Sequence, residues 1–153
     1  MLSWARLLAL DTPLLLLTGA YVGQYVYGLY PCEMCWWQRY PLFVALALAI
    51  VGWLPPQRKL WTQLAAAGIL VSGLIGGFHA GVEYGWWEGI TGCATTAQGG
   101  GDPLEAILDA PIVRCDVAPW SLFGISLAGW NFLISTTSAL LIFWLLRRER
   151  TLA

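Results

Sequence analysis

Four long apolar segments, separated by short polar stretches, dominate the sequence. They cover residues 12–30, 36–54, 60–84 and 122–146. About 20 apolar residues cross the hydrocarbon core of a bilayer as a helix, and a helix satisfies its own backbone hydrogen bonds in lipid. We therefore predict an all-α membrane protein, in which residues 1–153 form a single integral domain built as a bundle of four transmembrane helices. The first segment lacks an Ala-x-Ala-like cleavage site, so it is interpreted as a retained span.

The composition agrees with a lipid environment. Hydrophobic residues make up 58% of the chain and charged residues only 11%, whereas a soluble domain carries about 25% charged residues. The ten tryptophans fit the same picture, because indole rings gather at the membrane–water interfaces. A net charge of −1 argues against a nucleic-acid partner, since binding phosphates requires a basic surface.

The charges predict the orientation of the bundle. Six of the eight basic residues lie in the two termini and the connection between the second and third spans: Arg6, Arg58, Lys59, Arg147, Arg148 and Arg150. The outer loops, residues 31–35 and 85–121, carry most of the acidic residues, Glu83 included at their edge, with Arg39 and Arg114 as the remaining cations. By the positive-inside rule, both termini are cytoplasmic and the outer loops face the opposite side.

All four cysteines fall on that outer side, where disulfides form and persist. Cys32 and Cys35 lie in the first outer loop, and Cys93 and Cys115 lie in the second. Four cysteines allow three pairings, and the sequence leaves them open, although proximity favours Cys32–Cys35. A two-residue spacer closes too small a loop to restrict the unfolded chain much, which favours a redox role for this pair. For Cys93 and Cys115, a purely structural disulfide is the simpler interpretation.

Arg39 and His79 are candidates for roles beside the cysteines. Arg39 follows Cys35 by four residues, so on a helix both project from one face. There its charge could stabilise a thiolate or an anionic acceptor; the alternative is that Arg39 reaches out to the lipid headgroups. His79 is the only histidine and lies on a glycine-rich stretch suited to close helix packing. Its candidate roles are hydrogen bonding across that interface, proton relay and cofactor contact.

Two further interpretations concern metal binding and the second outer loop. The cysteine spacing does not fit paired zinc knuckles, and the oxidising side favours disulfides, so no metal site is predicted. Asp102-Pro103-Leu104-Glu105 has the pattern of a helix start, with an N-cap and a proline at the first position. We predict a short amphipathic helix there, preceded by glycines 99–101 that leave the loop free to move.

Together, these motifs resemble the signature of the disulfide bond formation protein B (DsbB) family. The resemblance rests on Pro-Cys32-Glu-Met-Cys35-Trp-Trp-Gln-Arg39, on Ala110-Pro-Ile-Val-Arg-Cys115-Asp, and on the Pro-Trp-Ser-Leu-Phe-Gly-Ile-Ser that follows. It covers nearly the whole chain. It implies a protein-disulfide oxidoreductase of the bacterial inner membrane, with the cysteines on the periplasmic side. Such a protein reoxidises a soluble, thioredoxin-like thiol oxidase (DsbA-like) and passes the electrons to the membrane quinone pool, ubiquinone or menaquinone.

The resemblance also implies a role for each cysteine. The redox-active disulfides are Cys32–Cys35 and Cys93–Cys115. Cys93 forms the mixed disulfide with the partner, Cys115 exchanges with Cys32, and Cys35 faces the quinone beside Arg39. Nothing is implied for His79. Two other interpretations compete: a vitamin K epoxide reductase-like protein, in which the cysteine order is reversed, and a membrane scaffold whose disulfides only stabilise its loops.

Overall fold

The computed structural model describes residues 2–54, 56–91, 94–95 and 112–151. The long helices are α1 (Leu2–Val26), α2 (Glu33–Val51), α3 (Arg58–Glu83) and α5 (Leu127–Thr151). Two short antiparallel pairs accompany them: β1 (Ala94–Thr95) with β2 (Ile112–Val113), and β3 (Ser121–Leu122) with β4 (Ile125–Ser126). These 4 helices are long and apolar enough to cross a membrane. The predicted four-helix membrane protein is confirmed.

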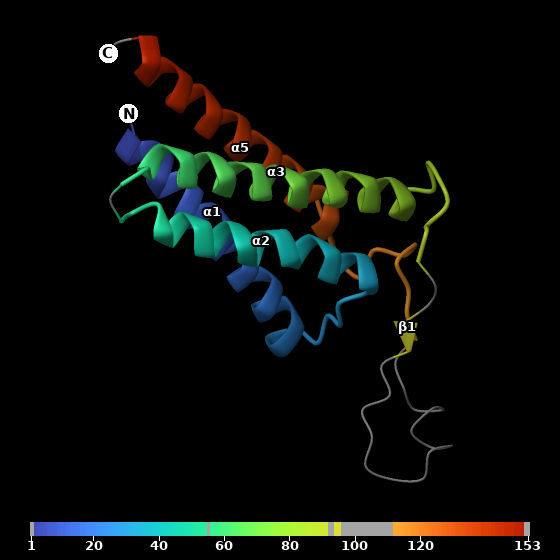
Figure 1. Ribbon diagram of the computed structural model, residues 1–153. Coiled ribbons are helices and arrows are strands. Elements are labelled where there is room, and N and C mark those ends of the chain that lie inside the picture. Colours follow the sequence, from blue (N-terminus) through green and yellow to red (C-terminus); the bar gives the residue numbers. More distant parts are fainter. Residues whose placement is uncertain (1, 55, 92–93, 96–111, 152–153) are drawn as a thin grey trace.

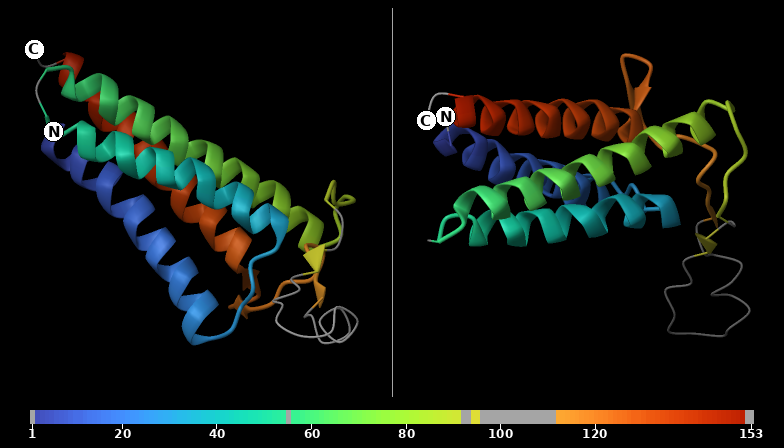
Figure 2. Two further views of the ribbon diagram at one scale, coloured as in Figure 1. Left: turned by 60° about the horizontal axis from the view of Figure 1, so that its bottom comes forward. Right: turned by 45° about the horizontal axis from the view of Figure 1, so that its top comes forward.

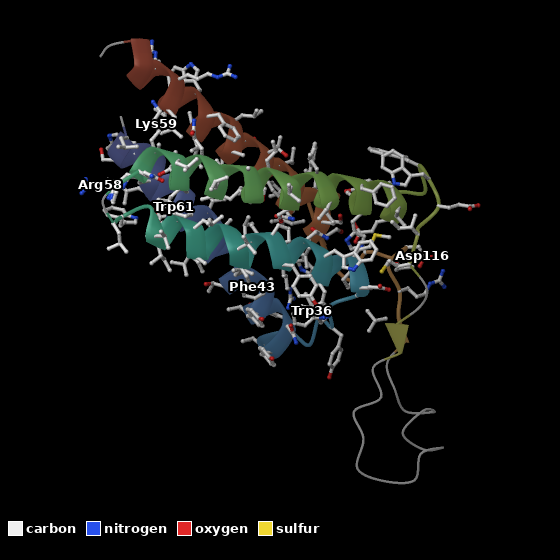
Figure 3. The ribbon with its side chains drawn as sticks, viewed as in Figure 1. Trp36, Phe43, Arg58, Lys59, Trp61 and Asp116 are labelled. Carbon is white, nitrogen blue, oxygen red and sulfur yellow. The ribbon has the colours of Figure 1, made fainter. Side chains whose placement is uncertain are left out.

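The helices run between two distinct ends of the molecule. Both ends of the bundle's chain and the α2–α3 connection lie at one end, and the described residues between α3 and α5 lie at the other (Figure 1). Arg58 and Lys59 mark the first end, and Asp116 lies near the second (Figure 3). This second end, called the outer end below, also holds the start of α2. The arrangement therefore brings the cysteine-bearing segments together.

Helix α3 packs against both α2 and α5, while α1 lies along the side of the bundle formed by α2 and α5 (Figure 2). Small side chains fill most of the core toward the terminal end: Ala5, Ala9, Ala45, Ala49, Ala65, Ala66, Ile69, Ala139, Ile142 and Leu146. Lipid tails are as apolar as leucine, so helices in a membrane associate by close packing rather than by the hydrophobic effect. Alanine permits that close approach.

The glycine-rich stretch of α3 has the packing role that its spacing predicts. A Cβ atom added to Gly73 would lie 2.8 Å from Thr136 Oγ1, and one added to Gly77 would lie 2.8 Å from Phe132 Cδ2. Both neighbours belong to α5. The α3–α5 contact therefore depends on the absence of side chains at these positions.

The helix bounds differ most from the predicted spans at the starts of α1 and α5. Helix α1 already begins at Leu2 instead of residue 12, and Arg6 lies within it with its guanidinium 4.1 Å from the centre of the Trp53 ring. Helix α5 begins at Leu127 instead of residue 122, because the preceding apolar residues form the β3–β4 hairpin. Positive φ angles at Phe123 (54°) and Gly124 (77°) form its two-residue turn, as a tight hairpin requires.

Some predicted features lie outside the described residues. They are Cys93, glycines 99–101 and the amphipathic helix predicted to start at Asp102.

Candidate functional site

The site is built around the first turn of α2. Cys32 is the N-cap residue, and its Sγ accepts a hydrogen bond from the backbone N–H of Cys35 at 3.4 Å. The thiol of Cys32 also donates to Cys35 Sγ, with the sulfurs 3.1 Å apart. Pro31 before the cap and Glu33 in the first turn suit a helix start. The Cys-x-x-Cys spacing thus places both sulfurs at the positive end of the helix, where negative charge on sulfur is favoured.

Cys115 joins this pair from the second outer loop. Its side chain is buried and packs with Cys32, Met34 and Val82. Residues far apart in the sequence therefore present three sulfur atoms to one another at the outer end of the bundle.

The environment of these thiols controls their protonation. The hydrogen bond to Cys35, together with burial, raises the pKa of Cys32 from 9.0 to about 12. Burial likewise raises the pKa of the Cys115 thiol. The exposed carboxyl of Asp116 has a lowered pKa, because the guanidinium of Arg114 binds it. When the site is reduced, the uncharged thiol is therefore the favoured form of both Cys32 and Cys115.

His79 lies beside the sulfur cluster and is 2% exposed. Its Nε2 lies 3.6 Å from Cys32 Sγ and 3.2 Å from the backbone oxygen of Cys115. Its Nδ1 lies 2.8 Å from Gln38 Nε2. Of the three predicted roles, the structure shows hydrogen bonding across a helix interface.

Gln38 belongs to a buried polar network that the sequence analysis missed. Asn131 Nδ2 on α5 donates to Gln38 Oε1 at 2.8 Å, and the hydroxyl of Ser72 on α3 donates to the backbone oxygen of Gln38 at 2.8 Å. Ser135 donates to Asn131 Oδ1 at 2.8 Å. The available signal was a polar residue within each of three apolar spans, which marks a candidate functional position. Which of these residues meet depends on the tertiary packing.

Glu83 was grouped with the outer charges by sequence, but its side chain is only 2% exposed. One carboxylate oxygen lies 3.7 Å from His79 Nε2, and the other has no hydrogen-bond partner among the described residues. Glu83 also lines a pocket of about 580 Å³ at the outer end, together with Trp86, Trp87, Glu88 and Asp116 among others.

Arg39 points in another direction, toward α1. It is 6% exposed, and it donates to Gln24 Oε1 at 2.7 Å and to the backbone oxygen of Ala20 at 3.3 Å. Its guanidinium carbon lies 5.0 Å from the ring centres of both Tyr21 and Trp36. Its burial does not fit the alternative in which it reaches out to the headgroups. Its charge is close enough to act on the Cys35 thiol.

The donor atoms of Cys32, Cys35 and His79 lie within 4.8 Å of one another, a spacing that could hold a metal ion. The hydrogen bonds argue for thiol chemistry instead. Gln38 Nε2 faces His79 Nδ1, and an amide nitrogen is only a donor. The imidazole proton is therefore on Nε2, the nitrogen that would have to bind the metal.

The chain matches known proteins over almost its full length. The family model described as "Disulfide bond formation protein DsbB" matches residues 3–145. A "Disulfide bond formation protein B" from Azoarcus sp. (strain BH72) is 30% identical over 148 residues, covering 89% of this chain and 86% of the relative. A protein of the same name from Verminephrobacter eiseniae (strain EF01-2) is 31% identical over 156 residues, covering 93% and 84%.

A third relative, the "Disulfide bond formation protein B" of Aromatoleum aromaticum, is 32% identical over 144 residues, covering 86% of this chain and 84% of the relative. No solved structure matches the chain significantly. The family match spans all four helices and includes the cysteine cluster at the start of α2. This chain is a member of the DsbB family of disulfide bond formation proteins.

Proposed function

We propose that this membrane oxidoreductase takes electrons from a soluble, thioredoxin-like thiol oxidase of the periplasm and passes them to quinone. The proposal rests chiefly on one observation, the packing of Cys115 against Cys32, whose sulfur lies 3.1 Å from that of Cys35. Disulfide exchange requires a thiolate to meet a disulfide sulfur. A contact between cysteines of the two outer loops supports a relay from one pair to the other, whereas stabilisation of separate loops would not require it.

The relay begins with two exchanges. A thiolate of the reduced partner attacks Cys93, a mixed disulfide forms, and the Cys93–Cys115 bond breaks with its electron pair on Cys115. The Cys115 thiolate then attacks Cys32, the Cys115–Cys32 bond forms, and the Cys32–Cys35 bond breaks with its electron pair on Cys35. Each step breaks one disulfide and forms another, so electrons are conserved. The two electrons thereby reach Cys35, the sulfur on which the charge of Arg39 acts.

The residues around Arg39 fit a quinone. Among the described residues, no carboxylate forms a salt bridge with Arg39. Burying a cation without an anionic partner is costly, so an acceptor oxygen beside the guanidinium would be stabilised. A guanidinium has five N–H donors, so Arg39 can bind a quinone oxygen in addition to Gln24 and Ala20. Tyr21 and Trp36 would bind the apolar ring. When bound, quinone supplies a two-electron acceptor that becomes quinol on taking up two protons.

The orientation follows from the same proposal. The outer end faces the periplasm of a bacterial inner membrane, and both termini lie in the cytoplasm. Arg58 and Lys59 at the terminal end (Figure 3) support this orientation under the positive-inside rule. The cysteine cluster then lies at the end of the bundle that faces the soluble partner, near the lipid that carries quinone.

The test is quinone reduction by the purified protein in detergent, supplied with a reduced dithiol protein and with ubiquinone or menaquinone analogues. Wild type is compared with Cys35→Ser and with Thr18→Ala, a control on the exposed face of α1. We expect turnover in wild type and in the control, and none in Cys35→Ser. A folded wild type that reduces no quinone, or a fully active Cys35→Ser variant, would refute the proposal and favour the scaffold interpretation.

A further inference from the structure

We propose that His79 is a positioning residue that holds Cys115 against Cys32, and that Gln38 fixes the imidazole tautomer this role requires. The inference rests on the proposed relay, because it assigns His79 to the exchange between the two cysteine pairs. It goes beyond the relay by naming two residues from different helices, α2 and α3, that carry no sulfur.

The tautomer follows from the hydrogen-bond chain. Gln38 Nε2 lies 3.2 Å from the backbone oxygen of Met34, and Asn131 Nδ2 lies 3.2 Å from that of Ser72. Carbonyl oxygens only accept, so both amide nitrogens must point toward them. Gln38 Oε1 therefore accepts from Asn131, and Gln38 Nε2 donates to His79 Nδ1. Neutral His79 then carries its proton on Nε2.

That N–H faces the reacting groups. It donates to the backbone oxygen of Cys115 at 3.2 Å, and Cys32 Sγ lies 3.6 Å away. The titratable groups around the ring are Glu83 on its own helix, Cys32 and Cys35 at the start of α2, and Cys115 from the outer loop. One imidazole thus binds the peptide of the attacking cysteine and borders the sulfur that is attacked.

This geometry assists one defined step. The Cys115 thiolate attacks Cys32 Sγ, the new bond forms between them, and the electron pair of the broken bond leaves on Cys35. The attack requires the sulfurs to be close and aligned, and holding two reactants in place lowers the entropic cost of their reaction. The His79 hydrogen bond supplies that restraint to a cysteine that is otherwise carried on a long loop.

The first experiment measures how strongly the fold favours the Cys32–Cys115 bond. The background is Cys35→Ser, Cys93→Ser. In it, the Cys32 and Cys115 thiols react with oxidised glutathione to give the Cys32–Cys115 disulfide and reduced glutathione. The equilibrium constant of this reaction gives the effective concentration of the two thiols. One hydrogen bond of ordinary strength corresponds to about a threefold to tenfold change. We expect His79→Phe, which keeps a ring and removes the N–H, to lower the effective concentration by that factor. Thr18→Ala should leave it unchanged, and an unchanged value in His79→Phe would overturn the inference.

The second experiment observes the tautomer directly. Because His79 is the only histidine, 15N-histidine labelling reports on one ring in the full-length protein. We expect the nitrogen shifts of the Nε2–H tautomer in wild type. Gln38→Glu, which replaces the donor with an acceptor, should move the proton to Nδ1 or add a second proton. A wild-type ring protonated only on Nδ1 would overturn the inference even if His79→Phe failed to fold.

Neither measurement uses quinone or the soluble partner. A protein that fails to reduce quinone but shows both expected results would refute the proposed function and leave the positioning of Cys115 by His79 intact. The converse result would refute the role of His79 alone.

Discussion

In the reduced protein, Cys32 should react with iodoacetamide as a thiol of very low acidity. Its hydrogen bond to Cys35 and its burial raise its pKa from 9.0 to about 12. Only the thiolate is nucleophilic. Below pH 9, raising the pKa by about three units reduces the thiolate fraction about a thousandfold relative to a cysteine with a pKa of 9.0. Because the pKa of Cys32 is about 12, its rate of alkylation should increase with pH over the whole accessible range.

The perturbation is Cys35→Ala, which removes the largest cause of the raised pKa. Burial still acts on Cys32 in this variant, while the hydrogen bond from His79 acts in the opposite direction. We expect the pKa of Cys32 to fall by at least about one unit, which corresponds to roughly tenfold or more thiolate at pH 8. Both proteins carry Cys93→Ser and Cys115→Ser, so that Cys35 of the parent is the only thiol besides Cys32.

The assay is the initial rate of alkylation between pH 7 and pH 10, with mass spectrometry of fragment ions assigning the modified sulfur. In the parent protein the rate at Cys32 should rise tenfold per pH unit without levelling off. Access of the reagent changes the absolute rate but not this slope. A parent profile that levels off below pH 10, or the same profile in Cys35→Ala, would refute the coupling between the two sulfurs.

Three other predictions concern packing, the polar network and the proposed quinone site. Gly77→Ala should lower the melting temperature in detergent, because its Cβ would lie 2.8 Å from Phe132 and overpacking costs about 1–3 kcal/mol. Gly19→Ala is the control and should not lower the melting temperature, because a Cβ there has nothing within 4 Å. Equal shifts in the two variants would contradict this prediction. Asn131→Leu should cost about 1–3 kcal/mol for each buried polar group it leaves unpaired, so an unchanged melting temperature would contradict the network. Arg39→Lys, which lacks the planar fork, should raise the KM for quinone about tenfold with a smaller effect on kcat. An unchanged KM would exclude Arg39 from quinone binding.

The sequence was sufficient to predict features that depend on local chemistry. Four apolar stretches predict four helices, and the Cys32–Cys35 spacing predicts neighbouring sulfurs at a helix start. The hairpin before α5 was missed because its residues are nearly as apolar as the helix that follows. The turn depends on positive φ angles at Phe123 and Gly124, and a Phe-Gly pair is a weak signal for such a turn.

The parts that could not be predicted depend on contacts between helices. Gln38, Ser72 and Asn131 each interrupt a different apolar segment, but only the packing of α2, α3 and α5 shows that they meet around one amide. In the sequence Glu83 resembles the other outer charges, and its burial beside His79 depends on the tertiary packing around the end of α3. The sequence shows which polar residues are present in the apolar segments. Their hydrogen-bond partners depend on how the helices of the bundle pack.

The helix cap at Cys32 has a thermodynamic consequence. Cys32 Sγ, which accepts the N–H of Cys35 in the first turn of α2, also loses and regains a covalent bond in the proposed relay. A helix N-terminus favours the negative charge that a reduced pair can carry and an uncharged disulfide cannot. Helix formation at the start of α2 and reduction of the Cys32–Cys35 pair are coupled, and such coupling is reciprocal. If the reduced sulfurs stabilise the start of the helix, the helix stabilises the reduced pair by the same free energy. The reduction potential of the pair therefore becomes more oxidising. Under the proposed function, the fold of α2 therefore contributes to drawing electrons out of the soluble partner.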